Sequence, residues 1–326
     1  MYKYVYGPIP SRRLGISLGI DILPRKVCNF NCVYCECGKT MRLITERAEY
    51  HPADAVLAEI RDFMAKNPPP DFLSFSGSGE PTLNSGLGRM LRELKKDFPE
   101  TKIAVFTNSS LMNVRDVRQE LLFSDVVLPS LDAASEEAYI KIDRPHPDIK
   151  IGDIISGLEE FTREFKESGP RKAIWLEIFI IDGINTDDYN IRKLREAVLR
   201  INPDRVQLNT LDRPGVENWV KPAPGEVLEA VKLKLNLKNV EIIKKFKNRE
   251  EFKAYRKDAE DTIIDTLRRR PSTLEDLSII LSIGEEEVSG YLDILIHNQI
   301  VKAEIFNIPG ERGVFYKLKP EPDNED

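Results

Sequence analysis

The sequence predicts an α/β fold, a partial (β/α)6 barrel of the TIM type followed by a small second domain. Short apolar segments rich in branched and aromatic residues alternate with amphipathic segments of helical period. Such alternation produces a parallel sheet covered by helices, and six repeats fall short of the eight that close a full barrel. The expected strands are residues 17–22, 72–76, 102–107, 125–130, 174–181 and 205–209, with helices over 54–66, 151–166 and 187–199.

The composition is that of a globular chain large enough to bury a sizeable core. Of its 326 residues, 41% are hydrophobic and 31% are charged, and the net charge is −6. This acidity argues against general polyanion binding and leaves any such role to local basic stretches. No apolar run approaches the ~20 residues that cross a bilayer, so we expect a cytoplasmic protein without a membrane partner.

Three cysteines in one eight-residue run indicate a soft metal centre. Cys28, Cys32 and Cys35 follow the spacing C-x3-C-x2-C, and three thiolates are one short of closing a tetrahedral site. A four-iron cluster held by three cysteines keeps one iron open to an outside ligand, which suits chemistry on a bound molecule. The spacing therefore predicts a [4Fe-4S] cluster on these three residues.

Other uses of the cysteines stay open at this point. A zinc site would need a remote histidine, and neither His51, His146 nor His297 lies at ligand spacing from the run. Such a chain would be a zinc-bearing regulatory or binding protein without catalysis. A disulfide is disfavoured because four cysteines in 326 residues make no disulfide framework. The fourth cysteine, Cys37, is either a bystander thiol or a catalytic hydrogen-atom donor near the substrate.

Small or polar residues follow the predicted strands. Beyond the cysteine run, which follows the first strand, they are the run 76–83 (Ser-Gly-Ser-Gly-Glu-Pro-Thr-Leu), Thr107-Asn108, Ser130-Leu131-Asp132 and the run 181–185. Small residues let the backbone approach a ligand, and Glu80 offers a carboxylate to an ammonium group. Each turn alone is ordinary. Five of them on one rim of a barrel indicate a binding site, because the carboxyl ends of parallel strands share that rim.

Together these motifs resemble the radical S-adenosylmethionine (SAM) superfamily over roughly residues 10–215. The cysteine run resembles its cluster motif, and the run 76–83 resembles its Gly-Gly-Glu-Pro motif with Ser78 in place of the first glycine. The resemblance implies that SAM binds the open iron and contacts the strand ends. The SAM-contacting residues it implies are Tyr34, Gly77, Gly79, Glu80, Pro81, Thr107, Asn108, Ser130, Asp132 and Ile181.

The same resemblance implies a mechanism and a redox partner. A one-electron reductant of the ferredoxin or flavodoxin type reduces the cluster, which then cleaves SAM reductively. The resulting 5′-deoxyadenosyl radical abstracts hydrogen from a substrate, so the cofactors supply the difficult chemistry and the protein supplies orientation. Because Cys37 is the one cysteine outside the motif, a second cluster held by protein thiolates is not expected.

The sequence gives fewer indications of the substrate. Residues 130–133 and 142–145 resemble wyosine-type and molybdenum-cofactor-type members, and the opening 6–15 resembles a group of prokaryotic iron–sulfur oxidoreductases. We expect Arg12, Arg13 and Arg144 to hold a phosphate or carboxylate of the substrate, although Arg12 and Arg13 could equally be surface charges paired with carboxylates. An RNA base, as in tRNA modification, is the first hypothesis, and a protein or peptide is the alternative.

The last third of the chain predicts a winged helix. Helices over 273–281 and 285–297 are followed by strands over 300–306 and 313–318 around Pro309-Gly310. The second helix begins with three glutamates, and residues 258–319 hold 12 acidic against 7 basic residues. Such a surface repels phosphates, so duplex DNA is not expected as a partner. A peptide-docking, intramolecular or oligomerisation role fits this charge.

These observations divide the chain into four parts. We expect a barrel domain with an N-terminal Pro/Arg segment over 1–246, a linker helix over 247–257, a winged helix over 258–319 and a disordered acidic tail over 320–326. We expect the winged helix to recruit substrate and to be dispensable for SAM cleavage. The alternative is that it covers the open side of the barrel and protects the edge strands there.

Overall fold

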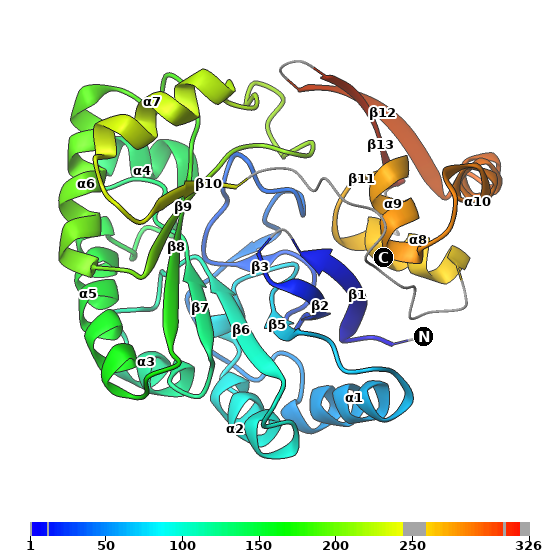
Figure 1. Cartoon of the computed structure of the whole chain (residues 1–326), viewed down its shortest axis with the longest axis horizontal. Coiled ribbons are helices and arrows are strands. Elements are labelled where there is room, and N and C mark those ends of the chain that lie inside the picture. The colour runs from blue at the N-terminus through cyan, green and yellow to red at the C-terminus, as the bar shows by residue number, and fades with distance from the viewer. Residues whose placement is uncertain (1, 12, 244–258, 309–310, 320–326) are drawn as a thin grey trace.

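The computed structural model describes residues 2–11, 13–243, 259–308 and 311–319. Within these residues, eight strands form one sheet that curves around a central space, with helices on its outer face (Figure 1). Neighbouring strands from β2 to β10 are parallel, whereas β1 runs antiparallel to β2. In sheet order the strands are β1 (Val5–Ser11), β2 (Gly15–Ile20), β5 (Phe72–Phe75), β6 (Lys102–Thr107), β7 (Val126–Pro129), β8 (Ala173–Phe179), β9 (Arg205–Asn209) and β10 (Val240–Ile242).

The predicted partial barrel is confirmed, and one strand is added at each end of the six that were predicted. The N-terminal segment forms β1, with a register shift between Tyr6 and Ile9. Its prolines are tolerated because β1 is an edge strand, where a missing backbone N–H costs no ladder hydrogen bond. At the other edge, β10 continues the parallel order beside β9.

Helices cover the outer face of the sheet and bury their apolar sides against it. They are α1 (Ala53–Lys66), α2 (Leu87–Asp97), α3 (Arg115–Leu121), α4 (Glu136–Asp143), α5 (Ile151–Glu167), α6 (Asp188–Ile201) and α7 (Gly225–Leu235). The Asp187 carboxylate accepts hydrogen bonds from the N–H groups of Tyr189 and Asn190, which fixes the start of α6. The three helices expected from periodicity are confirmed as α1, α5 and α6.

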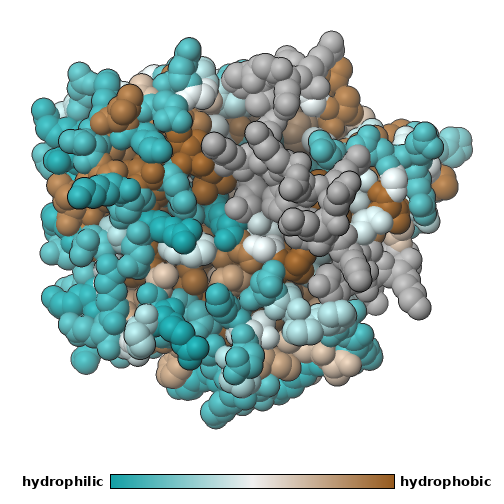
Figure 2. Space-filling model, viewed as in Figure 1, coloured by the Kyte–Doolittle hydropathy of each residue, from teal (hydrophilic) through white to brown (hydrophobic). Residues whose placement is uncertain are grey.

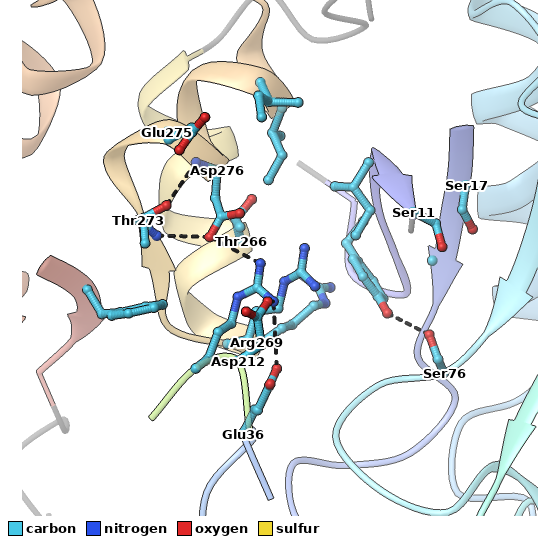
Figure 3. A pocket seen from close by; sticks show the side chains of 18 of the residues that line it. Ser11, Ser17, Glu36, Ser76, Asp212, Thr266, Arg269, Thr273, Glu275 and Asp276 are labelled. Carbon is cyan, nitrogen blue, oxygen red and sulfur yellow. Dashed lines mark hydrogen bonds and ion pairs between the residues drawn. The ribbon is translucent and has the colours of Figure 1, made fainter. Parts of the chain in front are cut away.

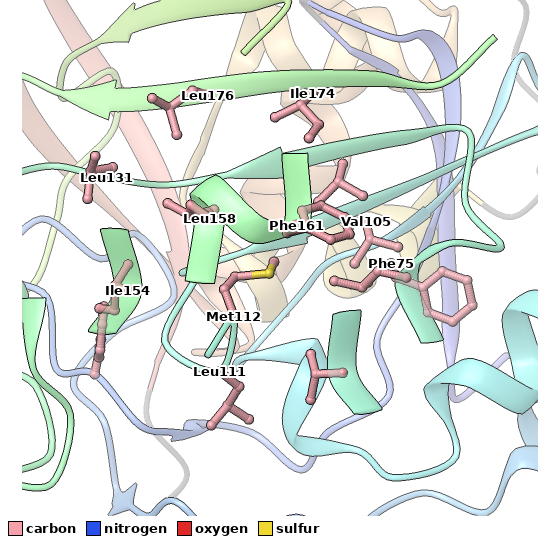
Figure 4. Close-up of a cluster of buried hydrophobic side chains, with 14 of the residues drawn as sticks. Phe75, Val105, Leu111, Met112, Leu131, Ile154, Leu158, Phe161, Ile174 and Leu176 are labelled. Carbon is pink, nitrogen blue, oxygen red and sulfur yellow. The ribbon is translucent and has the colours of Figure 1, made fainter. Parts of the chain in front are cut away.

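The main hydrophobic core lies between the sheet and these helices. Figure 4 shows Leu158 and Phe161 of α5 beside Val105 of β6 and Ile174 of β8, and all four side chains are fully buried. The outer surface over α3 and α5 is mostly hydrophilic (Figure 2). In the described part of the chain, no helix combines the length and the apolar character that crossing a bilayer requires.

The C-terminal residues form a separate small unit with the elements predicted for a winged helix. Its elements are α8 (Ala259–Arg269), β11 (Ser272–Thr273), α9 (Leu274–Leu281), α10 (Glu285–His297), β12 (Val301–Ile308) and β13 (Glu311–Leu318). The strands pair antiparallel in the order β11-β13-β12. Buried Ile263, Leu277 and Leu292 give the unit a hydrophobic core of its own. The expected linker helix, the Pro309-Gly310 turn and the acidic tail lie outside the described residues.

This C-terminal unit packs against the edge of the sheet. Helices α8 and α9 contact β1, and Figure 1 shows the unit beside that strand. An exposed edge strand is a template for unwanted pairing, and a covering helix is one way in which proteins protect it. The arrangement is therefore the one expected of a cover over the open side of the barrel.

Truncating a core side chain of α5 should destabilise the protein far more than truncating an exposed one. Leu158 is fully buried, whereas Leu199 of α6 is 52% exposed. We expect Leu158→Ala to lower the free energy of unfolding by about 2–5 kcal/mol, because it leaves a cavity. We expect Leu199→Ala to change it by less than about 0.5 kcal/mol. Chemical denaturation of both variants measures the difference, and equal effects would contradict the placement of α5.

Candidate functional site

The cysteine loop is fixed at both ends by backbone hydrogen bonds. The short strands β3 (Val27–Cys28) and β4 (Arg42–Leu43) pair in parallel at its base. Farther along, the N–H of Asn31 donates to the carbonyl of Asp143 (3.0 Å) and the N–H of Val33 donates to that of Ile142 (2.9 Å). The loop therefore lies against the end of α4, at the rim where the parallel strands end.

Each cysteine of the motif has a distinct polar neighbour. The Asn108 amide lies 3.7 Å from the Cys28 sulfur, and a carboxylate oxygen of Asp143 lies 3.7 Å from that of Cys32. The Lys26 ammonium donates to the Cys35 sulfur at 3.1 Å. None of the chain's four cysteines, all of which the structure describes, forms a disulfide.

Burial and neighbouring groups separate the acidities of these thiols. Burial raises the pKa of Cys28 to about 12 and also raises the pKa of Cys32. The hydrogen bond from Cys37 lowers the pKa of Cys35, and the charge of Lys26 lowers it further. Among the three motif thiols, Cys35 is therefore the one that most readily forms a thiolate, which is the form that binds metal.

Cys37 lies between the cysteine loop and the glycine-rich run. Its sulfur is 3.5 Å from the carbonyl oxygen of Gly77, and its side chain lines a large chamber between the sheet and the C-terminal unit. This position is consistent with either of the roles considered for it, bystander thiol or hydrogen-atom donor.

Glu80 joins the ends of β5 and β6. One carboxylate oxygen accepts hydrogen bonds from the hydroxyls of Thr107 (2.6 Å) and Thr82 (2.5 Å), and the other accepts the N–H of Asn108 (2.7 Å). Burial raises the pKa of Glu80, while these hydrogen bonds act in the opposite direction. The carboxylate is therefore held in one orientation, and Pro81 starts the 3-10 turn Pro81–Leu83 that follows it.

Two glycines bring the run 76–83 against the cysteine loop. Gly77 has φ +149°, and a Cβ there would collide with the carboxylate of Asp21. At Gly79 a Cβ would collide with the carbonyl oxygen of Val27, directly before the first cysteine. Glycine is therefore required for this close approach. The serine between them bonds to Asp21 through its hydroxyl (2.6 Å), which explains why the motif tolerates a serine there.

Tyr34 and Asp132 connect the cysteine loop to β7 and β8. The Tyr34 hydroxyl donates to the Asp132 carboxylate, and its ring stacks on Phe179 with centroids 3.8 Å apart. Asp132 also accepts the N–H of Phe179 at 2.8 Å. Burial raises the pKa of Asp132 and of Asp143. Each carboxyl is therefore more easily protonated than a carboxyl in water.

The remaining predicted contact residues lie on the same rim. Ser130 lines a closely packed cavity of about 10 Å³ together with Tyr34, Asn108 and Asp132. Ile181 is buried in one hydrophobic cluster with Tyr34 and Phe179. The structure thus brings together the predicted residues from all five strand ends.

Sequence reasoning missed two residues of this rim. Lys26 stands two positions before Cys28, and its basic character beside the thiols was a usable signal. Asp143 lies in the stretch 142–145, directly before Arg144. Its place at the site depends on the fold, because α4 ends at Asp143 and directs its carboxylate toward Cys32.

The two predicted substrate arginines that the structure describes are paired with carboxylates. Arg13 forms an ion pair with Glu177 of β8 and its side chain is 9% exposed. Arg144 pairs with Glu217 at 2.5 Å, and Arg12 lies outside the described residues. Arg13 also lines the large chamber, so a contact with substrate stays a prediction for it.

The thiols of Cys28, Cys32 and Cys35 are the kind of ligand that an iron–sulfur cluster requires. Among the described residues, no group of three or more His, Cys, Asp or Glu side chains is arranged to hold a single metal ion. A four-iron cluster distributes its thiolates over separate irons, so its ligands lie farther apart than those of one ion. Three thiols on one loop supply the ligand type that such a cluster needs.

Comparison with known proteins decides the family. The profile described as "Radical SAM superfamily" matches residues 22–195, which include the cysteine loop and the strands from β3 to β8. The chain belongs to the radical SAM superfamily. A [4Fe-4S] cluster and SAM are therefore its cofactors, and the two cofactors predicted from the sequence are confirmed.

Several relatives of this radical SAM protein carry a UPF0026 name. One from Methanocaldococcus jannaschii is 35% identical over 69% of each chain, and one from Helicobacter pylori J99 is 29% identical over 91% of this chain and 93% of its own. A Brachyspira hyodysenteriae protein named GTPase Obg is 34% identical over 94% of this chain, which spans only 44% of that protein.

Solved structures show the same fold at low sequence identity. A radical SAM methyltransferase from Sphaerobacter thermophilus has a TM-score of 0.53 at 17% identity, covering 69% of this chain and 65% of that one. Streptococcus suis SuiB bound to S-adenosylmethionine has a TM-score of 0.50 at 17% identity, covering 69% of this chain and 50% of that one. These similarities concern the barrel fold and give no information about the substrate.

Adding one methyl group at Gly79 should disturb the site while leaving the fold intact. We expect Gly79→Ala to lower SAM cleavage by about 100-fold, because the Val27 carbonyl must shift to make room and ångström-scale misplacement costs this much. Gly152 of α5 has open space around its Cβ position, so Gly152→Ala is the matched control. Release of 5′-deoxyadenosine measures the effect, and unchanged release from Gly79→Ala would contradict the close approach.

Proposed function

We propose that this protein cleaves SAM reductively at a [4Fe-4S] cluster bound by Cys28, Cys32 and Cys35. The cluster and SAM, when bound, supply a 5′-deoxyadenosyl radical that abstracts hydrogen from a substrate. The observation that carries the proposal is the meeting of the three-cysteine loop with the Glu80 carboxylate on one rim of a radical SAM barrel. Asn108 joins them, because its side chain faces Cys28 and its N–H bonds Glu80.

The protein's own residues orient the cofactor. Glu80 is the group that accepts hydrogen bonds from the SAM ammonium, because Thr107 and Asn108 fix the orientation of its carboxylate. A nearby cation would also offset the free-energy cost of burying this negative charge. Tyr34 and Ile181 offer apolar surface for the adenine.

The electron must come from outside the chain. Because Cys28, Cys32 and Cys35 are assigned to one cluster, Cys37 is the remaining cysteine of the sequence. One thiol cannot hold a second cluster of four cysteine ligands. A one-electron reductant of the ferredoxin or flavodoxin type therefore serves as the redox partner in this proposal.

A nucleotide base in RNA is the proposed substrate. Trp219 is 47% exposed beside Lys141, Lys221 and Ile181, around a depression of about 660 Å³ at the carboxyl rim of the barrel. Exposed aromatic rings stack on unpaired bases and lysines attract phosphates, so this combination favours single-stranded RNA. The resemblance of residues 130–133 to wyosine-type enzymes supports the same choice.

A basic peptide is the second candidate, and one observation favours it. Helix α10 begins with Glu285, Glu286 and Glu287, and the latter two are exposed. Such an acidic end attracts a cationic partner and repels phosphates. In this version the C-terminal unit recruits the substrate rather than only covering the barrel edge.

Replacing the three motif cysteines one at a time should remove the cluster. After anaerobic reconstitution we expect about four irons per wild-type chain, and 5′-deoxyadenosine on addition of SAM and dithionite. Cys28→Ala, Cys32→Ala and Cys35→Ala should lose both signals, because each removes a ligand. Cys37→Ala is the control and should keep its iron. A triple variant that retains the cluster, or wild-type protein loaded with tetrahedral zinc, would contradict the assignment.

The two candidate substrates can be separated in cells. Modified nucleosides and peptide masses are compared by mass spectrometry between a strain lacking this protein and its parent. We expect a modified nucleoside to disappear from the RNA of the deletion strain and to return with the wild-type gene but not with Cys28→Ala. A change confined to peptide masses would favour the second candidate. Accumulation of a small metabolite with neither change would contradict both.

A further inference from the structure

A chamber of about 1080 Å³ lies between the sheet and the C-terminal unit. One wall comes from β1, β2 and β5, and the facing wall from α8, α9 and β13 (Figure 3). Cys37 and Gly77 line it too, so the chamber reaches the loops of the proposed cofactor site. Its volume suits a molecule of nucleotide size, because small-molecule sites span about 300–1,000 Å³.

The sheet side of the chamber carries hydroxyl groups. Ser17 and Ser74 share a hydrogen bond of 2.5 Å, and Ser76 shares one of 2.8 Å with the hydroxyl of Tyr6. A polar wall of this kind offers donors to an anionic ligand. Because Ser76 directly precedes Gly77, this wall continues into the glycine-rich run.

Two arginines of the C-terminal unit reach this chamber. Arg269 ends α8 and Arg270 follows it. The Arg269 guanidinium lies over the ring of Tyr6, 4.2 Å from its centroid, and donates to the carbonyl of Asp265 at 2.9 Å. Its Nε is buried and has no hydrogen-bond partner among the described residues. The Arg269 guanidinium therefore packs on an aromatic ring and donates to a backbone carbonyl.

A third arginine forms ion pairs with carboxylates that line this part of the chamber. Arg213 is 6% exposed and pairs with Asp276 (3.1 Å), Asp212 (3.7 Å) and Glu36 (4.0 Å). In the described part of the chain, neither Arg269 nor Arg270 forms an ion pair with a carboxylate. Asp276 and Glu36 lie near enough to Arg270 to act on its charge, but both are paired with Arg213. The two guanidinium groups thus line the chamber without an ion pair of their own among the described residues.

We propose that Arg269 and Arg270 bind a phosphate group of the substrate inside this chamber. The proposal rests on the function proposed above, because it names the chemistry of the molecule on which that function acts. A planar guanidinium matches phosphate oxygens in a bidentate geometry, and two of them balance a group that carries nearly two negative charges. Burial lowers the pKa of both arginines, and a bound anion reverses that effect.

The chamber fits a single phosphate better than a run of phosphodiesters. Glu275 and Glu285 also line it, and Glu275 is exposed. Their carboxylates repel a polyanion that would extend past the two arginines. The phosphate therefore belongs to one nucleotide-sized unit, either the 5′ end of an RNA chain or a free phosphorylated molecule.

Calorimetric titration of the full-length, reconstituted protein tests this site. The probes are inorganic phosphate and uridine 5′-monophosphate, which carries no adenine to compete for the SAM site. We expect Arg269→Gln and Arg270→Gln each to weaken the affinity for both probes about tenfold or more, because each removes a charge-assisted hydrogen bond. Arg268→Gln is the matched control, since its side chain is 47% exposed and pairs with Asp265.

Several outcomes separate binding from mere packing. Arg269→Lys should retain part of the affinity, since it keeps the charge and loses the planar guanidinium. If Arg269→Gln does not fold, Arg269→Lys and Arg270→Gln are used for the test instead. Wild-type protein that binds neither probe overturns the proposal. The proposal is also overturned if folded variants at both arginines bind the probes with wild-type affinity, even if their melting temperature falls.

The source of the phosphate and the underlying function are read out independently. Tighter binding of a 5′-phosphorylated oligoribonucleotide than of its 5′-hydroxyl counterpart supports an RNA end. Binding of uridine 5′-monophosphate without any effect of the oligonucleotide phosphate supports a free molecule. Both results support the phosphate site. Release of 5′-deoxyadenosine by the same wild-type sample tests the proposed function, so a failure there is distinguishable from a failure of the phosphate site.

Discussion

The hydrogen bonds that Glu80 accepts from Thr107 and Asn108 hold the ends of two neighbouring strands together, and the site is arranged around them. The carboxylate is buried, so each missing donor would leave a costly unpaired charge. Asn108 in turn reaches Cys28 and Asn29 with its side chain. One carboxylate therefore sets the distance between the rim of the sheet and the cysteine loop.

Parallel strands explain why so few residues suffice to build this rim. Their carboxyl ends lie at one edge, so each connecting turn contributes its first polar residue to the same place. Asp132 illustrates the result, because it bonds Tyr34 from the loop and Phe179 from β8. The glycines of the run 76–83 then allow two backbones to meet where side chains would keep them apart.

The strands, the rim and its residues could be predicted from sequence because periodicity and turn chemistry are local signals. Pairings between distant residues could not. Arg13 meets Glu177, more than 160 positions away, and nothing in the sequence distinguishes that carboxylate among the 54 acidic residues. Lys26 is basic and stands close to the cysteines in the sequence, but only the fold shows which thiol its ammonium group reaches. The chamber arginines could not be singled out from the sequence, because their environment depends on how two units pack.

Arg213 makes the C-terminal unit and the cysteine loop thermodynamically dependent on each other. Its guanidinium pairs with Asp276 of α9 on one side and approaches Glu36, beside Cys35, on the other. Whatever stabilises the loop also stabilises the docked unit, and the coupling free energy is the same in both directions. Acquisition of the metal should therefore favour the docked arrangement of the C-terminal unit, so maturation of the cofactor becomes a step in tertiary assembly.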